Sequence, residues 1–186
     1  MKKMMMMAAM LVAVLSANAQ NEIGQITVKP MVGVNLSTIT DEKDSETKTG
    51  LTIGAEAEYG FTEKIGFSAG LLYSQQGCKF DGDDDEEKLD YINIPVLANY
   101  YVMPGLAIKA GIQPGFLMSA KDENSKSFKD HCKSFAFSIP IGASYEIQNF
   151  VVDARYNLGL TKINKRGDKS HQNSLFSITV GYKFAL

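Results

Sequence analysis

The sequence has few cysteines, little net charge and, after residue 20, no long hydrophobic run. Among its 186 residues are two cysteines, too few for a disulfide scaffold or a four-thiolate zinc site but enough for one bridge. The formal net charge is only −2, which disfavours a disordered chain and a nucleic-acid-binding surface. After residue 20 no hydrophobic run is long enough for a membrane-spanning helix, and no apolar stripe has helical spacing. The length predicts one domain.

The N-terminus has the three parts of a secretory signal peptide. Two lysines precede an apolar stretch of 12 residues, and the small residues Ser16-Ala17-Asn18-Ala19 follow. This arrangement predicts cleavage after Ala19, which leaves Gln20 as the first residue of the mature protein. The alternative is a retained membrane anchor, but an anchor needs about 20 apolar residues. We therefore expect an exported protein with a signal peptide over residues 1–19 and one domain over residues 20–186.

The rest of the chain repeats with a period of two. Phe176, Ile178 and Val180, for example, alternate with small or polar residues, as in a strand with two different faces. The same alternation predicts eight strands of about a dozen residues, near 26–37, 49–61, 65–77, 89–102, 106–118, 134–147, 150–161 and 174–186. Strands of soluble proteins peak at about 5–6 residues, whereas a strand that crosses a membrane needs about 9–11.

The connections between these strands alternate between short and long. Three are tight turns, near 62–64, 103–105 and 148–149, and four are long and charged, near 38–48, 78–88, 119–133 and 162–173. Outer-membrane barrels have short periplasmic turns and long extracellular loops. The alternative, a secreted lipocalin-like barrel, would turn its apolar face inward. We predict an all-β fold, an eight-stranded antiparallel transmembrane β-barrel in the outer membrane of a Gram-negative cell envelope.

Three local patterns carry a resemblance to a known family. They are the aromatic run Gly181-Tyr182-Lys183-Phe184, the run Tyr91-Ile92-Asn93-Ile94-Pro95-Val96-Leu97, and the Ala-x-Ala sequence followed by Gln at the expected cleavage site. With the eight amphipathic strands, they make the chain similar to the PorT-type outer-membrane β-barrel family of Bacteroidetes. The resemblance implies fold, location and assembly by the barrel-assembly machinery, and no catalytic residue carries over.

Ionisable residues occupy inward positions of the predicted barrel. Four are basic and four acidic, and all fall in the periplasmic half of their strands: Lys29, Glu56, Glu58, Lys109, Glu146, Asp153, Arg155 and Lys183. Side chains can just fill the interior of an eight-stranded barrel, and an unpaired charge there is costly. We expect a paired, hydrogen-bonded plug, in which Asn93, Asn99 and Gln113 satisfy leftover donors and acceptors. The alternative is a proton or ion path lined by the same groups.

The expected outer loops differ in charge. Residues 81–87 hold six carboxylates, which suit a cation such as Ca²⁺ but are equally typical of a solvated, self-repelling loop. The last loop is basic, with Lys162, Lys165, Arg166 and Lys169. We expect basic groups to contact phosphates of lipopolysaccharide and acidic groups to reach it through divalent cations. Pairing between the loops themselves is the alternative.

The two cysteines, Cys78 and Cys132, both fall on the outer side of the predicted barrel. A bridge between them would close about 53 residues and contribute about 4 kcal/mol if unstrained. Their strands are not neighbours, so the loops would have to fold over the barrel mouth to bring the Cα atoms within about 7 Å. Two separate thiols are the alternative.

The sequence predicts neither an enzyme nor a cofactor. Its only histidines are His131 and His171, and Asp130 is not placed to orient His131, because neighbours on a strand point to opposite faces. We expect a monomeric barrel, closed by its lumenal charges, whose loops contact outer-membrane lipid and lipopolysaccharide, a host or matrix component, or another envelope protein. The alternative is a narrow pore or a transport-associated protein.

Overall fold

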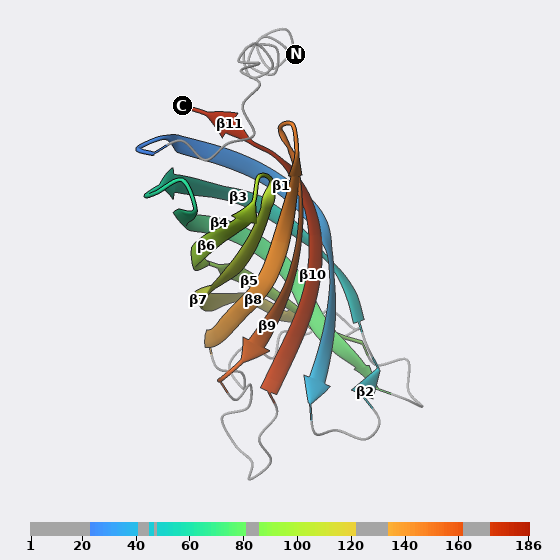
Figure 1. Ribbon diagram of the computed structural model, residues 1–186. Coiled ribbons are helices and arrows are strands. Elements are labelled where there is room, and N and C mark those ends of the chain that lie inside the picture. Colours follow the sequence, from blue (N-terminus) through green and yellow to red (C-terminus); the bar gives the residue numbers. More distant parts are fainter. Residues whose placement is uncertain (1–22, 41–44, 47, 81–85, 122–133, 162–171) are drawn as a thin grey trace, which may run out of the picture.

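A computed structural model describes residues 23–40, 45–46, 48–80, 86–121, 134–161 and 172–186 (Figure 1). These residues contain no helix long and apolar enough to cross a membrane. They form the strands β1 (Ile26–Thr40), β2 (Ser45–Glu46), β3 (Lys48–Gly60), β4 (Ile65–Phe80), β5 (Glu86–Asn93), β6 (Val96–Met103), β7 (Leu106–Lys121), β8 (Phe135–Ile147), β9 (Phe150–Gly159), β10 (Gln172–Tyr182) and β11 (Phe184–Ala185).

These strands close into one antiparallel barrel. Each strand pairs with its neighbours, and β10 and β11 pair with β1 to complete the ring. β5 and β6 are two halves of one strand that is interrupted at Ile94 and Pro95, because proline has no amide hydrogen for the ladder. β10 and β11 are the halves of the last strand on either side of Lys183. With the short β2 set aside, the barrel has the eight strands predicted from the alternation.

The observed strands match the predicted ones to within three residues at every end. The differences gather at the ends of β1, β4, β5 and β7 that lead into the long connections, where the ladder continues into polar and charged residues. Alternation of apolar residues gives no signal there. Cys78 pairs with Glu87 across the β4–β5 ladder, so the connection expected over 78–88 is limited to 81–85.

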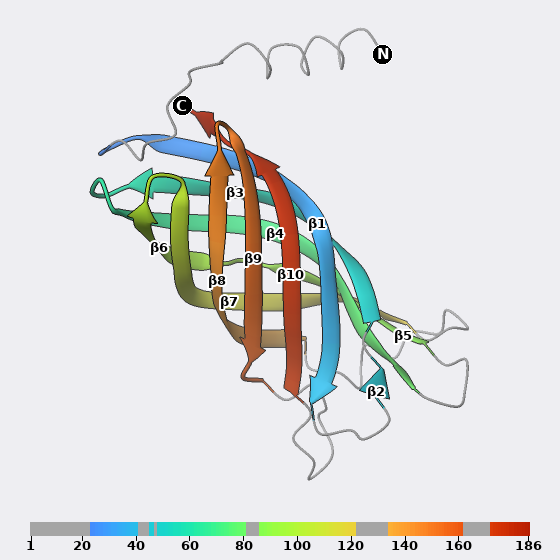
Figure 2. The ribbon, with the colours of Figure 1, turned by 45° about the vertical axis from the view of Figure 1, so that its right-hand side comes forward.

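The three tight turns lie at one end of the barrel, together with both ends of the described chain (Figures 1 and 2). This end is called the turn end. Gly105 in the β6–β7 turn has a φ of 81°, a conformation that glycine adopts without steric cost. The four connections with undescribed residues leave from the opposite end, called the loop end. Tight turns were expected near 62–64, 103–105 and 148–149, and all three are confirmed.

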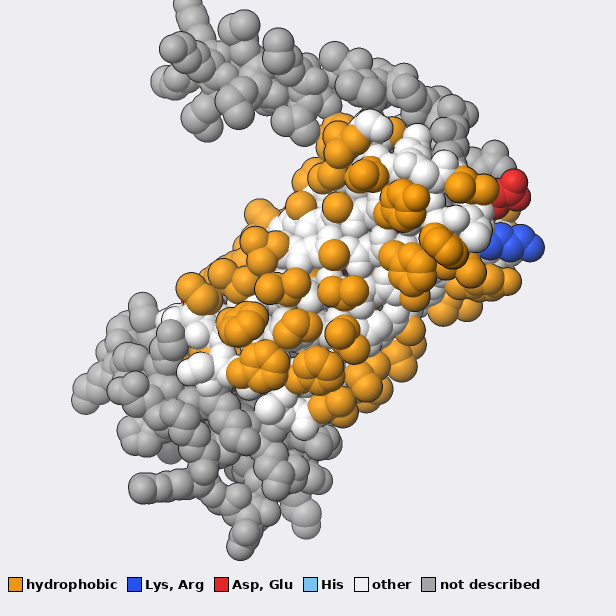
Figure 3. All heavy atoms as spheres, turned by 90° about the vertical axis from the view of Figure 1, so that its left-hand side faces the viewer, with side chains coloured by type: hydrophobic (Ala, Val, Ile, Leu, Met, Phe, Trp, Pro, Cys, Tyr) orange, Lys and Arg blue, Asp and Glu red, His pale blue; other side chains and the backbone are white. Residues whose placement is uncertain are grey.

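The outer wall of the barrel is apolar. Ile53 and Leu71 on the outer face are 48% and 58% exposed, while their chain neighbours Thr52 and Leu72, on the inner face, are buried. Hydrophobic side chains cover the barrel wall in Figure 3, and the charged side chains seen there lie only at one end. A continuous exposed apolar surface is the lipid-facing band of a membrane barrel. A lipocalin-like barrel would have the opposite orientation.

Aromatic side chains pair on this wall towards both ends. Near the turn end, the rings of Phe150 and Tyr182 lie 5.1 Å apart, and those of Tyr182 and Phe184 lie 4.6 Å apart. Near the loop end, Phe116 and Phe135 pair at 5.6 Å. Aromatic residues at both edges of the apolar band are typical of outer-membrane barrels, because their rings suit the membrane–water interface.

Candidate functional site

Five buried charged residues form a cluster across the lumen, in the half towards the turn end, and are called the central cluster. Its members are Lys29, Glu56, Lys109, Asp153 and Arg155, each at most 7% exposed. Arg155 donates from Nη2 to Glu56 Oε2 at 2.8 Å and to Asp153 Oδ2 at 2.7 Å. Its Nε donates to Asp153 Oδ1 at 2.6 Å, and its Nη1 donates to Glu56 Oε1. The guanidinium therefore bridges two carboxylates with paired, charge-assisted hydrogen bonds.

Two lysines complete the central cluster. Lys29 Nζ lies 3.2 Å from Glu56 Oε2 and 3.4 Å from Asp153 Oδ2. Lys109 Nζ lies 2.8 Å from Asp153 Oδ2. Three cations thus share two carboxylates, and the central cluster has a formal charge of +1.

A second cluster lies one layer nearer the turn end and is called the rim cluster. Lys183 Nζ donates to Glu146 Oε2 at 3.0 Å and to the hydroxyl of Tyr101 at 3.3 Å. The Tyr101 hydroxyl in turn donates to Glu58 Oε1 at 2.5 Å. With one cation and two carboxylates, the rim cluster has a formal charge of −1. The charge of each cluster offsets that of the other.

The β-ladder explains why these side chains meet. Lys29 and Glu56 are direct cross-strand partners, and Asp153 and Arg155 are two residues apart on β9, so they share the inward face. Glycine provides the necessary room on the neighbouring strand. Gly142 is the partner of Arg155, and a Cβ on it would lie 2.3 Å from the Ala154 carbonyl oxygen and 2.9 Å from Arg155 Cγ.

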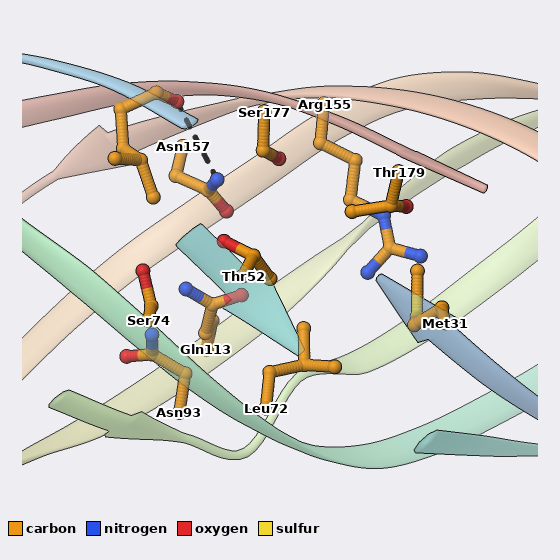
Figure 4. Close-up of a pocket in the computed structure, with 11 residues that line it drawn as sticks. Met31, Thr52, Leu72, Ser74, Asn93, Gln113, Arg155, Asn157, Ser177 and Thr179 are labelled. Atoms are coloured by element: carbon orange, nitrogen blue, oxygen red, sulfur yellow. Dashed lines mark hydrogen bonds between the residues drawn. The ribbon is translucent and has the colours of Figure 1, made fainter. Parts of the chain in front are cut away.

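Towards the loop end, the central cluster borders a small cavity lined by both polar and apolar side chains (Figure 4). Arg155 points into it, and uncharged side chains from several strands line the rest, among them Thr52, Asn93 and Gln113. The cavity offers about 20 Å³ to the centre of a water molecule, which is room for one or two waters. Asn157 donates to the Leu175 carbonyl at 3.4 Å, while its buried Oδ1 has no hydrogen-bond partner in the protein.

A smaller cavity lies between the two clusters. Lys29 and Lys109 line it from the central cluster, and Glu58 and Glu146 from the rim cluster. It gives the centre of a water molecule about 10 Å³, enough for a single water. In the described part of the barrel, neither of these cavities is wide enough for a hydrated ion.

The structure brings all eight predicted lumenal charges into the two clusters. The amides expected to assist them behave differently. Asn99 donates to Ser68 Oγ at 3.2 Å, and Asn93 and Gln113 line the cavity of Figure 4, beside the charged clusters. Tyr101 was missed, although it continues the inward alternation of Leu97 and Asn99 along β6.

Several predicted sites lie outside the described residues. They are Ala19 and Gln20 at the expected cleavage site, Cys132, both histidines, residues 81–85 of the acidic loop, and the basic residues at 162–169. Cys78 lies in β4, but its side chain is not described. Within the described residues, no group of three His, Cys, Asp or Glu side chains is placed to hold a metal ion.

The prediction that the chain is not an enzyme left one sequence pattern out of account. Gly66-Phe67-Ser68-Ala69-Gly70 has the spacing of the Gly-x-Ser-x-Gly elbow that presents a nucleophilic serine. That elbow needs a sharp turn between a strand and a helix. Here the segment lies inside β4, pairs regularly with β3 and β6, and Ser68 accepts a hydrogen bond from Asn99. Its context is therefore structural.

Comparison with known families gives the decisive observation. The family described as outer membrane protein beta-barrel domain matches residues 18–165. The chain belongs to this family. It is a small outer-membrane β-barrel, and its turn end therefore faces the periplasm. No curated protein matches the chain with significant similarity.

Solved structures show the same fold at low sequence identity. Ail, the attachment invasion locus protein of Yersinia pestis, in complex with the heparin analogue sucrose octasulfate, matches with a TM-score of 0.55 and 16% identity over 88% of this chain and 100% of Ail. Neisserial surface protein A matches with a TM-score of 0.53 and 15% identity over 91% of this chain and 99% of its own. At this identity the likeness concerns the fold.

Proposed function

We propose that this protein is a closed outer-membrane barrel, plugged by its own lumenal charges, whose extracellular loops make the contacts that carry its function. The central cluster is the observation that supports the plug. It spans the lumen from Glu56 on β3 to Asp153 and Arg155 on β9, and every charged group in it has an opposite charge within hydrogen-bond distance. A conducting path would have to break these pairs.

The cost of breaking the pairs favours a closed state. Removing one partner of a buried ion pair leaves an uncompensated charge and costs about 3–5 kcal/mol. The cavities on the two sides of the central cluster have room for only a few waters, so little solvent is available to replace the lost partner. Function is therefore expected at the surface and not through the lumen.

The extracellular partner is a polyanion in this proposal. The Yersinia Ail structure contains a heparin analogue, and the last extracellular connection of the present chain includes Lys162, Lys165, Arg166 and Lys169. Lysine and arginine at a membrane surface suit the phosphates of lipopolysaccharide. We also infer a PorT-type membership, removal of residues 1–19, and a monomeric barrel without enzymatic activity.

Conductance tests the plug. The mature chain, refolded in detergent, is inserted into planar bilayers after a gel shift between unheated and boiled samples shows that it has folded. We expect no current steps over many insertions. Discrete and reproducible current steps would contradict the closed barrel and favour the narrow pore.

Binding to lipopolysaccharide tests the loop. Proteoliposomes with the wild-type chain are compared with a Lys165→Glu, Arg166→Glu variant for retention of purified lipopolysaccharide at low and high salt. We expect the wild type to bind, salt to weaken binding, and the double variant to lose it, because two cations become anions. A Glu63→Lys, Lys64→Glu exchange in the exposed periplasmic β3–β4 turn is the matched control and retains binding. Equal binding by all three proteins would contradict the proposal.

A further inference from the structure

We propose that the two lumenal clusters hold the seam of the barrel together, where the seam is the ladder between β1 and the β10–β11 strand. These bonds across the seam are called the clasp. The seam is the place where the first and last strands of the chain meet. The inference goes beyond the proposed function, because it concerns how the barrel stays closed around its circumference. A barrel that conducts could still depend on such a clasp.

The backbone ladder of the seam has a gap. Met31 pairs with Gly181, and Val28 pairs with Phe184, in the same register on both sides of the gap. Pro30 and Tyr182 therefore lie opposite each other without ladder pairing, as Pro30 has no amide hydrogen. At Lys183, the backbone N donates to the Asn149 carbonyl at 2.7 Å and the backbone O accepts from Asn149 Nδ2 at 3.0 Å.

Like charges face each other at this gap. The shared register places Lys29 opposite Lys183, and both side chains point into the lumen. Like charges directly opposite each other on neighbouring strands destabilise a sheet. The seam therefore carries two local weaknesses, a missing stretch of ladder and a lysine pair, in the same place.

Bonds in the central cluster connect the strands on both sides of this gap. Around the barrel, β9 and β10 lie on one side of the seam, and β1 and β3 lie on the other. Arg155 on β9 binds Glu56 on β3 through two oxygens, and Asp153 on β9 lies 3.4 Å from Lys29 on β1. The carboxylates that neutralise Lys29 thus come from both sides.

The rim cluster adds a second connection. Lys183, just after β10, donates to Tyr101, and Tyr101 donates to Glu58 on β3. Tyr101 comes from β6 and reaches both sides of the seam from elsewhere in the barrel. Glu146 on β8 supplies the countercharge of Lys183. Lys29 thus has Glu56 on its own side of the seam and Asp153 across it. Lys183 has Glu146 on its own side and reaches Glu58 across the seam through Tyr101.

Disulfide cross-links across two different ladders test the clasp. The seam cross-link joins Val34→Cys and Ile178→Cys, which are Cα partners on the outer wall. The control cross-link joins Ile53→Cys and Tyr73→Cys, Cα partners across the uninterrupted β3–β4 ladder. Both are built in a Cys78→Ser, Cys132→Ser background. Each is combined with Glu56→Gln, and the temperature at which the compact band converts to the unfolded band on a gel is measured.

The expected result is specific to the seam. Glu56→Gln lowers the conversion temperature by roughly 10 °C in the background and in the control cross-link, since a buried arginine loses part of its countercharge. With the seam cross-link, Glu56→Gln lowers the conversion temperature by less than half as much. Reduction of the seam disulfide brings back the full decrease. A loss that is unchanged by the seam cross-link, or that both cross-links relieve equally, would overturn the proposal.

A milder variant covers the case in which Glu56→Gln does not refold. Tyr101→Phe keeps the ring and removes only the hydroxyl that joins Lys183 to Glu58. We expect a fall of a few degrees that the seam cross-link again relieves and the control cross-link does not. Equal falls in all three backgrounds would overturn the clasp. Neither readout depends on conductance or on binding, so failure of the clasp is distinguishable from failure of the proposed function.

Discussion

The two halves of the lumen fill the same narrow space with different chemistry. The periplasmic half holds paired charges, with Arg155 between Glu56 and Asp153. The extracellular half holds uncharged polar and apolar groups around a small cavity, followed by an apolar group of Leu89, Tyr91, Leu117 and Ala120, and its one buried charged side chain among the described residues is Lys48. Charged pairs are strong only while every partner is present, whereas hydroxyls and amides can exchange a protein partner for water. Substitutions of equal size should therefore have unequal effects in the two halves.

Arg155→Met has the largest expected effect. It keeps most of the side-chain volume but leaves Glu56 and Asp153 with only the two lysines as buried countercharges. We expect a loss of about 3–5 kcal/mol in the free energy of unfolding. Urea unfolding in detergent micelles, followed by the intrinsic fluorescence of tyrosine, measures it. A loss below about 1 kcal/mol would show that the central cluster contributes little to stability.

Gly142→Ala has an intermediate expected effect. The new methyl group would lie 2.3 Å from the Ala154 carbonyl oxygen, which is part of the neighbouring backbone and cannot rotate away. We expect a loss of about 1–3 kcal/mol from overpacking. Ala143→Gly, the adjacent and lipid-facing position, is the control and should change stability less. If both variants behave alike, Gly142 does not make room for Arg155.

Thr179→Val has the smallest expected effect. Thr179 is buried beside the extracellular cavity, but its hydroxyl has no protein hydrogen-bond partner. Valine has nearly the same shape, so we expect a change within about 0.5 kcal/mol, because no hydrogen bond within the protein is lost. A loss comparable to that of Arg155→Met would remove the contrast between the two halves.

Alternation alone located the strands and the inward phase of the lumenal charges. It works because each strand has one lipid-facing and one lumenal face, so that a single apolar row fixes the orientation of both. It could not locate strand ends in β4 and β5, where Lys79 pairs with Glu86 beyond the apolar band. The interruption at Pro95 also escaped it, because alternation reports the direction of side chains and not the backbone hydrogen bonds that a proline cannot donate.

The pairing inside the lumen was beyond sequence reasoning. Arg155 and Glu56 are 99 residues apart, and whether two inward residues meet depends on the stagger of the strands around the barrel. Equal numbers of acids and bases suggested pairing but did not assign partners. For the same reason, the division into a cluster of charge +1 and a cluster of charge −1 was not foreseen, nor was the role of Tyr101 between Lys183 and Glu58.

The coupling energy between Arg155 and Glu56 is the most direct test of the claim that paired charges hold the barrel closed. It follows from the unfolding free energies of the wild type, Arg155→Met, Glu56→Leu and the double variant in the same detergent. We predict that the double variant loses at least about 2 kcal/mol less than the sum of the single losses, because each single variant leaves a buried charge without its main partner. Losses that add within about 0.5 kcal/mol would contradict the account.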